Sequence, residues 1–361
     1  MRITSVSSHL ERLGLTRPYT IAFDTTDSVE NLIVRVETED GLLGLGAASP
    51  APHVTGETVE ACARALEPER VAWLVGRDVR SLSALCRELA GRAPEAPAAR
   101  AAVDMALHDL LAQRLEVPLV ELLGRAHDRL PTSITIGIKG VEETLAEAEE
   151  YVGRGFRILK VKTGLSLEED VERLRRLRER CPETSVRLRA DANQGYTGDQ
   201  TLRFFRETEG LGIEFLEQPI PAAEVETLRS FPQAARDRIA ADEALLSDRD
   251  AWSLAQAPRA AGIFNIKLMK CGGIFSAMRI AAVAELAGID LMWGCMDESV
   301  ISIAAALHAA FASPATRYLD LDGSLDLARD VAEGGFVIED GVMRTTSAPG
   351  LGVRVAGAGR G

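Results

Sequence analysis

The chain has 361 residues, of which 46% are hydrophobic and 26% are charged, a composition typical of a globular protein with a substantial core. Its formal net charge of −13 argues against a nucleic-acid partner, because the phosphate backbone repels an acidic protein. No stretch approaches the roughly 18 uninterrupted apolar residues of a membrane span, and the first residues lack a signal-peptide core, so no membrane association is expected.

The five cysteines are scattered along the chain without CxxC or Cys/His ligand spacing. This pattern predicts neither a zinc site nor a disulfide framework. A reducing cytoplasm is therefore the expected compartment.

Residues 3–50 show the pattern of an antiparallel sheet, with strand-like residues 31–36 and 42–47 flanking a turn at Glu39-Asp40-Gly41. The polar residues 23–27 are expected to form a loop. Helical periodicity follows Gly56 and resumes over residues 98–115. Strands followed by a run of helices predict an α+β unit over residues 1–125.

Residues 126–330 repeat one pattern, a short apolar run followed by a helical or loop segment. The eight runs are residues 134–138, 158–162, 186–191, 213–217, 239–242, 263–267, 289–294 and 318–322. Their starts lie 24 to 29 residues apart, room for one strand, one helix and two connections. Eight such units predict an α/β fold, a closed (β/α)8 TIM-like barrel. An open doubly wound sheet is the alternative, but the GxGxxG of its dinucleotide-binding form is absent.

One cluster of basic residues interrupts this acidic chain. It comprises Arg173, Arg175, Arg176, Arg178 and Arg180. Because Val171, Leu174 and Leu177 recur at helical spacing, we interpret the arginines as the solvated face of a helix rather than a nucleic-acid site. Residues 331–361 return to short strand-like pieces with turns and are expected to fold back on the first unit.

Charged residues stand at the ends of six of the eight predicted strands, where the active site of such a barrel is built. They are Lys160, Lys162, Asp191, Glu217, Asp242, Lys267, Asp320 and Asp322. A single acid in such a place is often only a helix cap. Three carboxylates on adjacent strands, however, would repel each other unless a cation neutralised them. Oxygen ligands without Cys or His indicate Mg²⁺, with Mn²⁺ as a substitute.

Lys160 and Lys162 lie on one face of their strand, so two ammonium groups share a small volume, which lowers the pKa of one of them. An edge strand protected by lysines is the alternative interpretation. Lys267 ends a strand four places away, across the barrel. Amines on both sides of a substrate suit removal of a proton from one face and its return from the other.

These motifs resemble the muconate-lactonizing subgroup of the enolase superfamily. The matching residues are Lys160-Val161-Lys162, Asp191-Ala192-Asn193, Glu217-Gln218-Pro219, Asp242-Glu243 and Asn265-Ile266-Lys267. The resemblance implies that residues 1–125 form a capping domain, completed by residues 331–361, over a barrel of residues 126–330. It also implies that Asp191, Glu217 and Asp242 hold the metal. Lys162 and Lys267 would be the acid/base catalysts, while Lys160 stays charged, lowers the pKa of Lys162 and faces the substrate carboxylate.

Asp320-Leu321-Asp322 resembles the Asp-x-Asp motif by which dipeptide epimerases hold the substrate ammonium group. A turn at Asp322-Gly323 is the alternative interpretation. The resemblance therefore implies an isomerase that epimerises the second residue of L,L-dipeptides by a two-lysine 1,1-proton transfer through a metal-stabilised enolate. A cycloisomerase, an N-acylamino acid racemase and a non-catalytic binding barrel remain alternatives. A homo-oligomer is compatible with this assignment.

Epimerases that act on Ala-Glu usually carry a basic residue in the capping loop near the N-terminus. Residues 23–31 contain none and instead offer Asp24, Asp27 and Glu30, while Asp297 and Glu298 follow the seventh strand. We therefore expect Asp24, Asp297 and Glu298 to favour dipeptides with basic or uncharged side chains. The alternative is that these acids are simply solvated.

Overall fold

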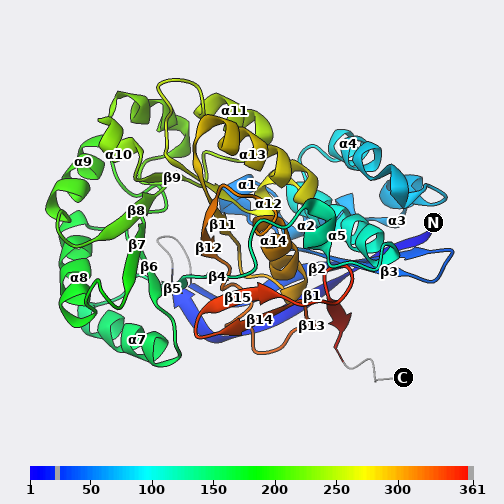
Figure 1. Ribbon diagram of the computed structural model, residues 1–361, viewed down its shortest axis with the longest axis horizontal. Helices are drawn as coiled ribbons and strands as arrows, with labels where there is room; N and C mark the ends of the chain where they lie inside the picture. The colour runs from blue at the N-terminus through cyan, green and yellow to red at the C-terminus, as the bar shows by residue number, and fades with distance from the viewer. Residues whose placement is uncertain (21–24, 357–361) are drawn as a thin grey trace.

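The computed structural model describes residues 1–20 and 25–356 and contains the predicted eight-stranded parallel barrel beside an N-terminal antiparallel sheet (Figure 1). The barrel strands are β5 (Ile134–Ile136), β6 (Ile158–Lys162), β7 (Arg187–Asp191), β8 (Ile213–Glu217), β9 (Ile239–Ala241), β10 (Ile263–Ile266), β11 (Asp290–Gly294) and β12 (Thr316–Asp320). Neighbours in sequence are neighbours in the sheet. The ring closes through a parallel bridge from Thr132 to Leu319. The predicted fold class is confirmed.

Helices connect the barrel strands and cover the outside of the ring, as the green and yellow segments of Figure 1 show. They are α7 (Val141–Gly153), α8 (Leu167–Arg180), α9 (Gly198–Glu207), η3 (Ala222–Ser230), α10 (Gln233–Arg236), α11 (Asp248–Leu254), α12 (Leu268–Cys271), α13 (Ile274–Ala287) and α14 (Val300–Ala310). Their apolar sides pack on strands whose outward side chains are buried. A large continuous core is the result.

The N-terminal sheet consists of β1 (Ile3–Thr20), β2 (Thr25–Thr38) and β3 (Leu43–Ala48), with the predicted turn between β2 and β3. The expectation of a loop over residues 23–27 is wrong for residues 25–27. These residues belong to β2, which pairs with the unexpectedly long β1 as far as Thr20 opposite Thr25. A polar sequence does not prevent strand pairing here, because the partner strand satisfies the backbone hydrogen bonds.

Helices α1 to α6 follow this sheet. They are α1 (Pro52–Thr55), α2 (Val59–Ala65), α3 (Pro68–Val71), η1 (Ala72–Leu74), η2 (Val79–Ser81), α4 (Leu82–Arg92), α5 (Pro97–Arg114) and α6 (Leu119–Leu123). Helix α5 lies directly on β3, because Gly44 and Gly46 present no side chain to it. A Cβ at Gly46 would stand 1.8 Å from the carbonyl oxygen of Ala102. Only glycine allows this close approach of strand and helix.

The C-terminal strands lie beside α14, and residues 350–351 contact the N-terminal helices α5 and α6 (Figure 1, red). Strand β13 (Ala332–Gly334) pairs with β16 (Val353–Val355), and β14 (Phe336–Glu339) pairs with β15 (Val342–Thr345), which pairs in turn with β4 (Leu130–Pro131). The link to α5 is polar. Asp109 of α5 accepts hydrogen bonds from the backbone N–H groups of Leu351 and Leu45, at 2.8 and 3.0 Å. One carboxylate thus ties the C-terminal segment to the N-terminal sheet.

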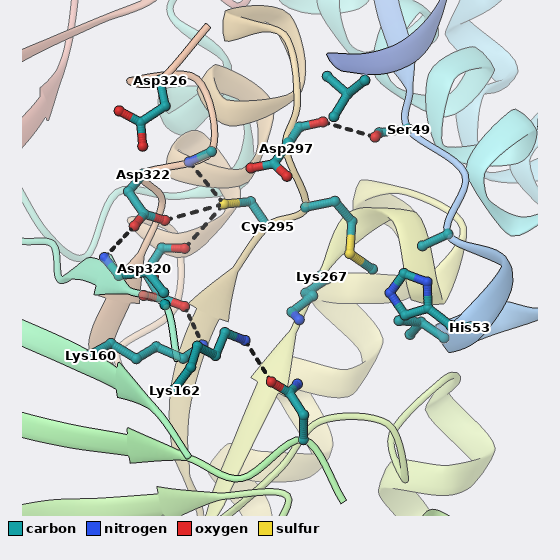
Figure 2. Close-up of a pocket in the computed structure, with 18 of the residues that line it drawn as sticks. Ser49, His53, Lys160, Lys162, Lys267, Cys295, Asp297, Asp320, Asp322 and Asp326 are labelled. Atoms are coloured by element: carbon teal, nitrogen blue, oxygen red, sulfur yellow. Dashed lines mark hydrogen bonds and ion pairs between the residues drawn. The ribbon is translucent and has the colours of Figure 1, made fainter. Parts of the chain in front are cut away.

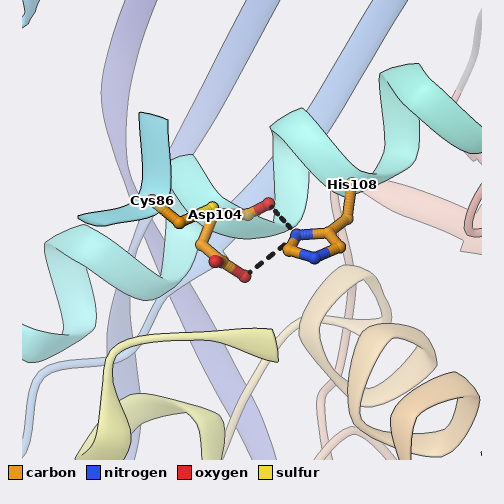
Figure 3. A group of neighbouring side chains, drawn as sticks. All are labelled: Cys86, Asp104 and His108. Carbon is orange, nitrogen blue, oxygen red and sulfur yellow. Dashed lines mark hydrogen bonds and ion pairs between the residues drawn. The ribbon is translucent and has the colours of Figure 1, made fainter. Parts of the chain in front are cut away.

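Asp104 of α5, which Figure 3 shows beside Cys86 and His108, connects the N-terminal helices to the barrel. Its carboxylate accepts hydrogen bonds from the backbone N–H groups of Ile274 and Phe275, which begin α13. Cys86 and His108 lie beside it, and His108 Nδ1 is 2.8 Å from the carbonyl oxygen of Asp104. Cysteine, aspartate and histidine are metal-ligating residue types. Here, however, the contacts of Asp104 and His108 account for the cluster as a packing contact between α5 and the start of α13.

The arginines of α8 were predicted to form a solvated face of the helix, and this prediction is wrong for two of them, Arg173 and Arg178. Arg173 is buried, pairs with Asp170 at 2.5 Å and donates to the carbonyl oxygen of Lys162 at 2.8 Å. Arg178 donates to four backbone carbonyl groups around the start of β7 and β8. Long side chains reach inward past the apolar face of a helix, which a helical wheel does not reveal. The others are exposed and ion-paired with glutamates.

None of the helices in residues 1–20 and 25–356 has the length and apolar character needed to cross a membrane.

His308 of α14 makes folding stability depend on pH. The side chain is fully buried, its Nδ1 accepts a hydrogen bond from Val120 N at 3.0 Å, and burial lowers its pKa to about 4. An unfolded histidine titrates near pH 6.5, so below that pH the unfolded chain binds a proton that the folded chain rejects. Stability is therefore complete above about pH 7 and falls by up to about 3 kcal/mol as the pH drops toward 4.

The measurement is urea unfolding of the wild type and of His308→Gln between pH 4 and 8. The glutamine amide oxygen can still accept the Val120 N–H but does not titrate. We expect the variant to lose part of the stability change between pH 6.5 and 4. Parallel pH curves for the two proteins would contradict the assignment.

Candidate active site

A cavity of about 950 Å³ lies at the carboxyl ends of the barrel strands. Its walls include the side chains of the strand ends and, from the N-terminal part of the chain, residues 28–30 and 49–54. Figure 2 shows Lys160, Lys162 and Lys267 pointing into the same region as Asp320 and Asp322. Parallel strands bring their carboxyl ends to one rim, so Thr135 of β5 and Asp322, which are 187 positions apart in sequence, meet here.

Lys160 and Lys162 lie on β6, which has β5 and β7 on its two sides, so the edge-strand interpretation is wrong. Both ammonium groups contact the same oxygen of Asp191, at 3.0 and 2.7 Å. Lys162 also donates to Asn193 Oδ1 at 2.9 Å. The shared carboxylate lies between the two positive charges and reduces their repulsion.

Lys160 is almost completely buried among carboxylates. Its Nζ lies 2.7 Å from Asp320 and 2.8 Å from Glu217, in addition to Asp191. Burial opposes its charge, but Asp191, Asp320 and Glu217 more than offset that cost and raise its pKa well above the usual value. Three carboxylates surround Lys160, and this environment favours its charged form.

Asp191, Glu217 and Asp242 lie at the ends of β7, β8 and β9 and are at most 1% exposed. Burial raises the pKa of Glu217, and the charges of Asp191 and Asp242 raise it further. Lysines lower the pKa of Asp191 and Asp242 despite their burial. Three adjacent carboxylates with no nitrogen or sulfur ligand are a donor set that fits Mg²⁺.

Lys267 enters the site from the opposite side of the ring, directly after β10. Its Nζ donates to Asp242 Oδ2 at 2.7 Å, and the neighbouring Lys270 contacts the other oxygen of the same carboxylate. Burial opposes the charge of Lys267, but Asp242 and Glu217 raise its pKa. Lys267 lines the cavity, whereas Lys270 does not. Lys270 instead donates to the carbonyl oxygens of Asp242 and Asn265.

Asp320 and Asp322 both line the cavity but have different surroundings. Strand β12 was expected over residues 318–322 but spans Thr316–Asp320, because Thr316 already pairs with β11. Asp322 thus follows the strand. Its Oδ2 accepts a hydrogen bond from Thr135 N at 2.7 Å, and burial, with the charge of Asp320, raises its pKa. Asp320 is bound to Lys160 and Ser133 instead.

The predicted specificity residues lie in three different places. Asp297 lines the cavity, and its carbonyl oxygen accepts a hydrogen bond from Ser49 Oγ at 2.9 Å. Glu298 is buried outside the cavity lining, and its Oε1 accepts from Met296 N at 2.6 Å. Asp24 lies outside the described residues. Glu30 of β2 does line the cavity.

Several cavity residues were not identified from the sequence. They are Thr135, Asn193, Glu243, Cys295 and Asp326. Asn193 and Glu243 belong to the quoted motifs, and their side chains contact each other at 3.3 Å. Their position one or two residues after Asp191 and Asp242 was the available signal. Thr135, Cys295 and Asp326 have no distinguishing pattern in the sequence.

The comparisons with known proteins agree with this geometry. Residues 143–358 match the family model "Enolase C-terminal domain-like", and residues 4–124 match the N-terminal domain of the mandelate racemase/muconate lactonizing enzymes. The L-Lys-D/L-Arg epimerase of Methylococcus capsulatus is 64% identical, over 98% of this chain and 99% of that protein. The L-Ala-D/L-Glu epimerase of Bacillus subtilis is 34% identical, over 98% and 97%.

A solved structure shows the same arrangement of the chain. The crystal structure of the M. capsulatus dipeptide epimerase, complexed with Mg and the dipeptide L-Arg-D-Lys, superposes with a TM-score of 0.96 at 64% identity. The match covers 98% of this chain and 99% of that one. The chain therefore belongs to the enolase superfamily and, within it, to the dipeptide epimerase family of isomerases.

Proposed function

We propose that this enzyme epimerises the second residue of L,L-dipeptides by a Mg²⁺-dependent 1,1-proton transfer between Lys162 and Lys267. The observation that carries the proposal is this pair of lysines, which enter one cavity from β6 and from the end of β10. These strands are four places apart in the ring of eight. Amines on opposite sides of a bound substrate can exchange a proton with both faces of one carbon atom.

Each lysine has a partner that orients it. Lys162 donates to Asn193, and Lys267 donates to Asp242. The neutral form of one lysine takes the α-proton of the second residue. The protonated form of the other then gives a proton to the opposite face of the same carbon. Because the roles alternate, the two residues serve both directions of the reaction.

Asp191, Glu217 and Asp242 would hold the Mg²⁺, with Mn²⁺ as a substitute. Such an ion supplies the positive charge that makes a carbon acid beside a carboxylate sufficiently acidic. The burial of all three carboxylates and their adjacent positions support this assignment. Lys160 adds a further fixed positive charge among them.

The amino end of the dipeptide would face the Asp320–Asp322 end of the cavity. Both residues line it, and Asp326 lines it beside them. The raised pKa of Asp322 marks a buried carboxylate with too little positive charge around it. A substrate ammonium group would supply that charge.

We further propose a preference for basic or uncharged side chains. Asp297, Asp326 and Glu30 line the cavity, and the 64% identical relative is named for lysine and arginine dipeptides. Lys139 also lines the cavity, but an ion pair with Glu147 neutralises its charge. Its contribution to binding an acidic side chain is correspondingly small.

A panel of L,L-dipeptides tests this preference. L-Ala-L-Lys, L-Ala-L-Leu and L-Ala-L-Glu are compared by chiral separation of the epimers. We expect kcat/KM for the lysine dipeptide to exceed that for the glutamate dipeptide by about tenfold or more, a difference of about 1.4 kcal/mol. Asp297→Asn should narrow this ratio. The matched control is Asp248→Asn, which changes an ion pair with Arg279 away from the cavity.

Faster turnover of the glutamate dipeptide would overturn the preference. Turnover of an N-acylamino acid in place of every dipeptide would instead move the enzyme to the racemase alternative.

The cytoplasm is the compartment we propose, because the five cysteines are free and four of them are buried, as expected in a reducing environment.

A further inference from the structure

A chain of polar contacts runs from the floor of the barrel to the active site. Arg189 lies on β7 two residues before Asp191, so both side chains point into the barrel, with Arg189 one layer deeper. The guanidinium lies 5.4 Å from the ring of Phe215 and 5.0 Å from the ring of Tyr318. Its Nε donates to Glu214 at 2.8 Å. These contacts fix a buried cation below the site.

Ser133 is the next member of the chain. Arg189 Nη1 donates to Ser133 Oγ at 3.1 Å and to the carbonyl oxygen of Leu319 at 2.8 Å. Ser133 N also donates to Leu319 O, at 3.0 Å, where the ring of strands closes. The serine is completely buried, so its hydroxyl has a fixed set of neighbours.

Asp320 is held at both of its oxygens. Ser133 Oγ donates to Oδ1 at 2.6 Å, and Lys160 Nζ donates to Oδ2 at 2.7 Å. Asp322 differs, because it accepts hydrogen bonds from Thr135 N at 2.7 Å and from the Cys295 thiol at 4.0 Å, and neither donor is charged. Of these two carboxylates, Asp322 has the greater capacity to accept a new donor.

We infer that Arg189 and Ser133 are positioning residues that hold Asp320 against Lys160. This inference rests on the proposed function. Through Asp320 the two residues orient Lys160, a lysine of the active site. Arg189 and Ser133 act only through Asp320 and do not touch the substrate.

The test compares Ser133→Ala, Asp320→Asn and Asp322→Asn with L-Ala-L-Lys as substrate. Ser133→Ala should lower kcat about tenfold and leave KM within about twofold, because the substrate contacts persist while Lys160 is less well placed. Asp322→Asn should raise KM about tenfold or more. The double variant Ser133→Ala/Asp320→Asn should be no slower than Asp320→Asn alone, because the serine acts through that carboxylate.

Controls separate this role from a general loss of structure. Ser313→Ala removes another buried hydroxyl, one with no hydrogen-bond partner among the described residues, and should leave kcat unchanged. Thermal unfolding confirms that each variant is folded. If the Arg189→Met variant folds, it should show the same loss of kcat as Ser133→Ala. If it does not fold, the Ser133→Ala variant alone tests the positioning role.

An unchanged kcat in Ser133→Ala would overturn the inference, as would a raised KM in that variant or additive effects in the double variant. The wild type runs in parallel. If the wild type does not epimerise the dipeptide, the proposed function itself is wrong. If the wild type is active and Ser133→Ala matches it, only the positioning role is wrong.

Discussion

Lys267→Ala abolishes epimerisation, with a loss in kcat of about 10³-fold, but still allows one epimer to exchange its α-proton with solvent. The loss follows because one face of the substrate carbon has no acid or base, and such groups contribute about 10²- to 10⁴-fold. Lys162 remains on the other face. In D₂O it should introduce deuterium into the epimer whose α-proton it faces, without inverting the centre.

Lys162→Ala should give the mirror result, with exchange in the opposite epimer only. Proton NMR of the α-proton, run separately on the L,L- and L,D-dipeptides, measures both variants. Lys139→Ala is the control, since this lysine lines the cavity but is paired with Glu147, and it should keep most of the wild-type kcat. Epimerisation by either single-lysine variant at the wild-type rate would contradict the two-base scheme.

Removal of divalent cations should lower activity about 10³-fold or more, and added Mg²⁺ should restore it. The reason is that the substrate α-proton is too weakly acidic without a nearby cation. Glu217→Gln should weaken Mg²⁺ binding about tenfold or more, because it removes one charge from a three-carboxylate set. Thermal unfolding with and without Mg²⁺ measures binding independently of turnover, since a ligand of the folded state raises the Tm.

Asp248→Asn, which changes an ion pair with Arg279 away from the cavity, should keep the wild-type response to Mg²⁺. Full activity after exhaustive chelation would contradict the metal assignment. A Glu217→Gln variant with the same Mg²⁺-dependent rise in Tm would remove Glu217 from the ligand set.

Much of the fold and of the site could be predicted because it depends on local pattern. The regular spacing of apolar runs predicted the barrel, and polar residues at the ends of those runs predicted a shared rim. Lys162 and Lys267 both line the resulting cavity. A single strand end carries little information, but strand order in a closed ring places the ends of all eight together.

The contacts that could not be predicted depend on where the ring closes and on long side chains that turn inward. Ser133 meets Asp320 across 187 positions of sequence, and only the closing seam brings them together. Arg173 belonged to a pattern typical of a solvated helix face, yet it reaches the carbonyl oxygen of Lys162. Residues 25–27 looked like a loop because they are polar, and their own sequence does not reveal the pairing with residues 19–20 of β1 that orders them.

The most direct test of the central claim is incubation of the wild type with L-Ala-L-Lys and Mg²⁺ in D₂O, read by mass spectrometry and chiral separation. The account predicts one deuterium in the second residue, none in the first, and appearance of the L,D-epimer together with the label. The account would be contradicted if L-Ala-L-Lys were recovered without deuterium and without its epimer, and if every other L,L-dipeptide in a test set gave the same result.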